Sequence, residues 1–158
     1  MHSRPAPELA DLRTRIERLE QTGRPGCGVL PFGIGPLDAA LPQGGLARGA
    51  LHEVAGGGDG AVDGAVAALF VAGIAARLPG QILWCVTRPD LFAPALQQAG
   101  LDPGRVLYVE AGDETSLLAC FEEGLRHGGI GAVVGEVARL SMTASRRLQL
   151  AAETSGTM

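Results

Sequence analysis

Hydrophobic residues near the start of the chain recur with a helical period. Between Glu8 and Gln21 they are spaced by three, four and three positions, at Leu9, Leu12, Ile16 and Leu19. Charged side chains occupy most of the intervening positions, so this segment is predicted to be an amphipathic helix. The Gly- and Pro-containing stretch Thr22–Gly28 should end the helix and act as a linker. The apolar stripe either docks on a partner molecule or packs on its own domain, and the pattern leaves both open.

Beyond residue 49, short apolar runs alternate with segments of helical period. The runs predict strands at Ala50–Ala55, Gln81–Thr87, Arg105–Ala111 and Ile130–Val137. The segments between and after them predict helices at Ala61–Leu78, Asp90–Gly100, Thr115–His127 and Thr143–Glu153, the last capped by Thr143. Four successive strand–helix units indicate an α/β fold with a parallel sheet and helices on both faces.

The predicted organisation is an N-terminal helix with its linker over residues 1–28, followed by a core over residues 29–158. Only Thr154–Met158 follows the last predicted helix. A parallel sheet with no strand after its final helix leaves an edge uncovered. We therefore expect the chain to be C-terminally truncated relative to its relatives.

Composition excludes several classes of function. All 13 basic residues are arginine, which rules out Schiff-base chemistry and the phosphate-binding lysine of a standard P-loop NTPase. A net charge of −4 does not fit a free-standing nucleic-acid binder. The three cysteines are far apart and have no C-x-x-C spacing, so neither a disulfide framework nor a metal site is expected. With no apolar stretch long enough to span a bilayer, a reduced cytoplasmic protein is the natural interpretation.

A glycine-rich loop lies between the first predicted strand and its helix, where α/β proteins bind phosphates. Its glycines are Gly56, Gly57, Gly58 and Gly60. Laid over G-x-x-x-x-G-K-[ST], the sequence has Val62 in place of the lysine and Asp63 in place of the magnesium-binding hydroxyl. The Asp63 carboxylate would repel the negatively charged phosphates of a nucleotide. At an effective dielectric near 20, one such like-charge contact at about 4 Å costs about 4 kcal/mol. We therefore predict a degenerate phosphate loop, with no cofactor and no catalytic residues.

Two further groups of polar residues are candidates. Arg139, Arg146 and Arg147 form the one basic cluster, either a solvated face or a contact with a phosphate or an acidic partner. Glu136 follows the last predicted strand, close to where a magnesium-binding carboxylate would stand, but it is displaced by one residue. Since such a shift turns a side chain to the other face of a strand, no metal site is predicted.

Several stretches together resemble one family. Leu30–Leu46 and Arg48–Val54 look like the entry segment of RecA-like proteins, with a Gly-Gly-Leu turn before the first core strand. More narrowly, that entry segment is similar to ImuA proteins, together with Asp90–Leu96, Gly100–Pro103 and Thr143–Glu153. The likeness covers about residues 29 to 153, and its motifs are specific in combination rather than singly.

The resemblance implies a RecA-like fold and a non-catalytic accessory role in damage-induced translesion synthesis under SOS control. It implies an adaptor acting with ImuB-type and error-prone DnaE-type polymerase subunits, with RecA as a further candidate partner. DNA contact is expected to be indirect or weak, because the short stretch Leu140–Thr143 leaves no room for the long DNA-gripping loop of RecA. Two alternatives are a SulA-type cell-division inhibitor and a RecA-like ATPase with an unconventional nucleotide site.

Overall fold

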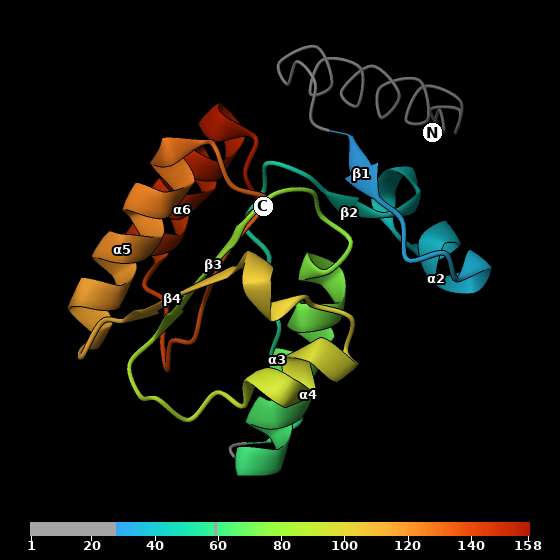
Figure 1. Ribbon diagram of the computed structural model, residues 1–158. Helices are drawn as coiled ribbons and strands as arrows, with labels where there is room; N and C mark the ends of the chain where they lie inside the picture. Colours follow the sequence, from blue (N-terminus) through green and yellow to red (C-terminus); the bar gives the residue numbers. More distant parts are fainter. Residues whose placement is uncertain (1–27, 59) are drawn as a thin grey trace, which may run out of the picture. The chain divides into compact units, whose positions relative to one another are not determined.

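The computed structural model describes residues 28–58 and 60–158 (Figure 1). The predicted N-terminal helix with Leu9, Leu12, Ile16 and Leu19 lies outside these residues. The chain divides into two compact units, Met1–Leu46 and Ala47–Met158.

The first unit contains short elements held by local hydrogen bonds. They are β1 (Val29–Leu30), α2 (Gly35–Ala40), the 3₁₀ turn η1 (Pro42–Gly44) and β2 (Leu46–Ala47), which pairs with β1. The Asp38 carboxylate accepts hydrogen bonds from the backbone N–H groups of Phe32 at 2.6 Å and Gly33 at 2.8 Å. These bonds fix the turn that leads into α2. A Cβ at Gly45 would lie 2.5 Å from the Leu30 carbonyl oxygen, so this position requires glycine.

The second unit is built on a parallel three-stranded sheet. Its strand order is β4 (Val106–Glu110), β3 (Ile82–Val86) and β5 (Ala132–Gly135). One side of the sheet carries α3 (Ala61–Ala75) and α4 (Ala93–Gln98), and the other carries α5 (Glu114–His127) and α6 (Met142–Ser155) (Figure 1). A 3₁₀ turn, η2 (Pro103–Arg105), precedes β4. The α/β class and the helices on both faces are therefore confirmed.

The first predicted strand, Ala50–Ala55, does not form, and the prediction of a four-stranded sheet is wrong for the described residues. The Leu51 N–H donates to the Gln149 side-chain oxygen on α6 at 2.8 Å. The position beside β5 is taken by Met158, whose N–H donates to the Gly131 carbonyl at 3.3 Å and whose carbonyl accepts from Val133 at 2.9 Å. The backbone groups of both segments thus bond to partners other than the ones that the local pattern indicates, a side chain for Leu51 and the backbone of β5 and the residue before it for Met158.

The core lies between the sheet and the α5–α6 pair. It is formed by Phe121, Leu125, Val133, Leu148 and Ala152. The first two lie one turn apart on α5, so they present one apolar face to the sheet. Glycine allows close approach at this contact, since a Cβ at Gly135 would lie 2.7 Å from a ring carbon of Phe121. On the other side, Trp84 is completely buried.

The helix ends show why these segments begin and stop where they do. Asp113 caps α5 by accepting a hydrogen bond from the Ser116 N–H at 2.8 Å, and this bond lowers the pKa of its carboxyl below the ordinary value. The α6 cap is Ser141, whose hydroxyl accepts from the Ala144 N–H at 3.2 Å, so the prediction of Thr143 is wrong by two residues. Arg105 holds the end of α3, donating to the carbonyls of Ala76 at 3.2 Å and Gly80 at 2.9 Å.

Candidate functional site

The glycine-rich loop leads directly into α3, as its sequence predicts. Gly60 is the N-cap residue of this helix, and it provides no side-chain hydrogen bond. Val62 and Asp63 lie in the first turn, and the Val62 side chain is 76% exposed. The loop therefore stands at a helix N-terminus, where the helix dipole favours a negative charge.

The Asp63 side chain itself lies against the loop. A Cβ at Gly56 would come within 2.6 Å of the Asp63 Cβ, and one at Gly58 within 3.1 Å of the Asp63 Oδ2. A Cβ at Gly60 would lie 3.4 Å from the same oxygen. The glycines therefore leave room for a carboxylate of the protein itself. This arrangement places a negative charge where a bound phosphate would need a positive one.

A second polar group lies beyond the carboxyl ends of β3 and β5. Burial raises the pKa of Glu136 above its ordinary value, and the nearby carboxylate of Asp90 adds to this effect. Among the residues that the structure describes, no three His, Cys, Asp or Glu side chains are close enough together to hold a metal ion.

The predicted basic cluster is distributed over α6 and the segment before it. Arg146 and Arg147 are both exposed on α6, and Arg139 is exposed in the segment between β5 and α6. The Arg139 and Ala138 backbone N–H groups approach Glu114 Oε1 on α5, at 3.4 and 2.8 Å respectively. This carboxylate therefore fixes the backbone next to the predicted basic residue.

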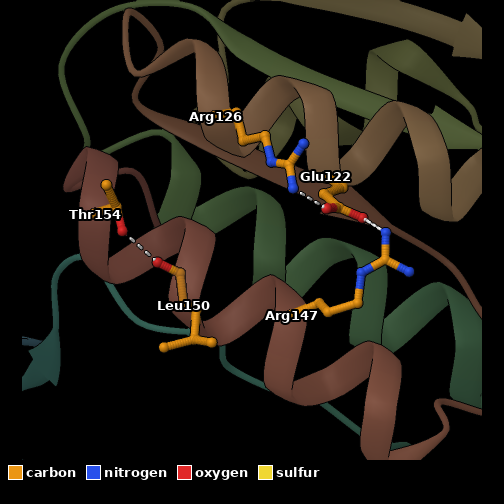
Figure 2. Close-up of polar contacts among 5 residues, drawn as sticks. All are labelled: Glu122, Arg126, Arg147, Leu150 and Thr154. Atoms are coloured by element: carbon orange, nitrogen blue, oxygen red, sulfur yellow. Dashed lines mark hydrogen bonds and ion pairs between the residues drawn. The ribbon is translucent and has the colours of Figure 1, made fainter.

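Arg147 takes part in an ion-pair triad that was not predicted from the sequence. Glu122 on α5 receives Arg126 at 2.6 Å from the next turn of the same helix, and its other carboxylate oxygen pairs with Arg147 (Figure 2). The Glu122 side chain is only 11% exposed, whereas those of Arg126 and Arg147 are 65% and 63% exposed. Glu122 and Arg126 are four residues apart on a predicted helix, so the sequence could have indicated this ion pair. The contact with Arg147 comes from the packing of α5 on α6.

The structure thus keeps the candidate features apart. The glycine-rich loop belongs to α3, and the arginine cluster belongs to α6 and its approach, on the other side of the sheet. Within residues 28–58 and 60–158, no helix combines the length and the apolar character that crossing a bilayer requires.

Comparisons with known proteins give two kinds of relative. Over 132 residues, 81% of this chain, it is 41% identical to Protein ImuA of Caulobacter vibrioides, in strains NA1000/CB15N and CB15 alike. The match covers 54% of those proteins, so the chain spans about half the length of the curated relatives it matches. No family model matches the chain.

Among solved structures, the crystal structure of SulA from Pseudomonas aeruginosa is similar. Its TM-score is 0.50 with 28% sequence identity, and the match covers 59% of this chain and 82% of the SulA chain. The α/β architecture described above is therefore shared with a known protein over more than half of the sequence.

Proposed function

Because this chain belongs to the ImuA family, of accessory proteins of SOS mutagenesis, we propose that it acts without catalysis in damage-induced translesion DNA synthesis. The observation that carries the proposal is the 41% identity over 132 residues. The proposed role is that of an adaptor for ImuB-type and error-prone DnaE-type polymerase subunits, with RecA as a further candidate partner.

The glycine-rich loop supports a role that does not use a nucleotide. The Asp63 carboxylate packs against the glycines, and Val62 replaces the cation that would offset the charge of a triphosphate. Isothermal titration with ATP and magnesium tests this part of the proposal. We expect no heat of binding, and micromolar binding accompanied by ATP turnover would contradict a non-catalytic role.

Two sets of residues are proposed to contact the polymerase partners. One is the apolar stripe of the predicted N-terminal helix, Leu9, Leu12, Ile16 and Leu19. The other is the basic cluster, Arg139, Arg146 and Arg147. Exposure of all three arginines supports the second set, since an exposed guanidinium can pair with carboxylates of a partner.

Co-purification with purified ImuB-type and DnaE-type subunits tests the adaptor role. Deleting residues 1–24 should abolish capture of the partner. Changing Leu12 and Ile16 to glutamate should do the same, while the control Arg18→Glu, on the polar side of the predicted helix, should retain it. If the wild-type chain captures neither subunit, the adaptor proposal is wrong.

A SulA-type inhibitor of cell division is the second candidate, and the structural similarity to SulA favours it. The two candidates differ in what overproduction of the chain does to a cell. A division inhibitor blocks septation and produces filaments. An accessory factor of mutagenesis changes the frequency of damage-induced mutations and leaves division unaffected.

A further inference from the structure

Met158 lies along the outer edge of β5, the edge that β3 does not occupy. Its N–H donates to the Gly131 carbonyl at 3.3 Å, and its carbonyl accepts from the Val133 N–H at 2.9 Å. A residue that bonds in this way to the two neighbours of Ala132 has the hydrogen-bond pattern of a parallel strand pair. Met158 therefore occupies one position of a strand that runs parallel to β5.

The buried residue Thr157 fixes the approach to this position. Only 2% of Thr157 is exposed. Its N–H donates to the Ser155 hydroxyl at 3.2 Å, and its own hydroxyl donates to the Ile130 carbonyl at 3.5 Å. These contacts tie the chain after α6 to the amino end of β5, so they direct the backbone of Met158 along the strand.

Two more backbone groups of β5 point to the same edge. Because strand residues alternate in direction, the Val133 C=O and the Gly135 N–H face outward together with the Val133 N–H that bonds to Met158. Among the described residues, no group bonds to either of them. They stand where the second residue after Met158 would pair in a parallel strand. Its N–H would donate to Val133, and its carbonyl would accept from Gly135.

The position beside β5 also defines which residues suit it. Helices α3 and α4 lie on one side of the sheet, and α5 and α6 lie on the other (Figure 1). A parallel strand that is covered on both faces is apolar at nearly every position. The outer edge of β5 therefore fits an extended run of apolar residues.

A second segment with the pattern of a strand lies close to Met158. Arg48 lines a cavity of about 340 Å³ together with Gly131 and Met158. Arg48 leads directly into Ala50–Ala55, whose backbone makes no hydrogen bond with other backbone groups of the described chain. A strand that continued from Met158 would therefore have strand-forming segments on both sides.

We propose that the outer edge of β5 is the docking site of an apolar segment that continues the chain from Met158 and adds a fourth parallel strand to the sheet. The length of the relatives supports this occupant, since the match covers only 54% of the Caulobacter vibrioides ImuA proteins. The added strand joins a further part of an ImuA protein to this α/β unit through the sheet rather than through a linker.

Amide hydrogen exchange followed by NMR tests the inference at single residues. In the 158-residue chain the Val133 amide should exchange slowly, because it donates to Met158, and the Gly135 amide should exchange fast. An extended variant adds about six residues, a typical strand length, after Met158. These are the residues that follow the counterpart of Met158 in Caulobacter vibrioides ImuA. Exchange at Gly135 should then slow by about tenfold, as the gain of one hydrogen bond predicts.

Proline substitutions in the added segment test the register of the pairing. Proline as the second added residue removes the N–H that should bond to Val133, so Gly135 should again exchange fast. Proline as the first added residue is the matched control, because its nitrogen faces away from β5 and the protection should remain. The amide spectrum of each variant establishes that it is folded.

Three results would each overturn the inference. They are slow exchange at Gly135 in the 158-residue chain, unchanged exchange at Gly135 in the extended variant, and equal effects of the two prolines. None of these measurements involves the polymerase partners, so their outcome is independent of the proposed function.

Discussion

Glu122 on α5 and Arg147 on α6 form an ion pair that joins the two helices on one side of the sheet (Figure 2). Arg126 completes the triad from the next turn of α5. Because Glu122 is nearly buried while both guanidinium groups reach solvent, the carboxylate is the group that depends on the pairing. The triad therefore fixes how α5 lies on α6.

Glu122→Gln should reduce stability by about 1–2 kcal/mol, because it removes two charge-assisted contacts while the arginines remain hydrated. The free energy of urea unfolding measures the loss. Glu123→Gln is the matched control, since the neighbouring side chain is exposed and should change stability little. Equal effects of the two substitutions would show that the triad does not stabilise the helix pair.

Gly131→Ala should destabilise the fold by about 2–4 kcal/mol. A Cβ at this position would lie 2.2 Å from the Pro79 carbonyl oxygen, a backbone atom that cannot turn away as a side chain can. Thermal unfolding measures the decrease in Tm. Gly64→Ala is the contrasting control. No atom lies within 4 Å of its added Cβ, so the substitution should stabilise α3 by about 0.5–1 kcal/mol.

The stability of α5 should depend on pH through Asp113. Hydrogen bonds from Ser116 lower the folded-state pKa of this carboxyl from 3.8. A lowered pKa means that the ionised form stabilises the folded state above pH 3.8, and that this contribution is lost as the pH falls through the folded-state value. Asp113→Asn can still cap the helix but carries no charge. Unfolding measured below pH 5 should therefore depend less on pH in this variant than in the wild type.

The Cys85 thiol should be unreactive in the folded protein. Burial, followed by the effect of the neighbouring Cys120, raises the pKa of Cys85 to about 11, and the side chain is completely buried. Labelling with iodoacetamide at neutral pH, followed by mass mapping, should modify Cys85 only in denaturant. Cys120 is partly exposed and serves as the internal comparison. Rapid labelling of Cys85 without denaturant would mean that β3 opens readily.

The sequence alone determined most of the elements in the second unit. The apolar runs around Ile82–Val86 and Val106–Glu110 marked two strands to within a residue at each end, because a buried parallel strand is apolar on both faces. The predicted helices differ from the observed ones only in where they begin and end, as at the N-cap of α6. The departures of Val62 and Asp63 from the phosphate-loop motif could be identified from the sequence, because the residues of that motif have a fixed spacing.

Tertiary structure decided which segments pair and which side chains come into contact, because the local sequence pattern does not specify these. Ala50–Ala55 has the composition of a strand, yet Leu51 bonds to Gln149 and Met158 takes the place beside β5. The pairing of Glu122 with Arg147 joins residues 25 positions apart. The exposed side of α3 could not be predicted either, because the helix is apolar on every side. Only its packing determines which face the sheet and α4 cover. The hydrophobic period of a segment determines which secondary structure it can form. Its tertiary contacts are decided by competition for hydrogen-bond partners and for buried surface.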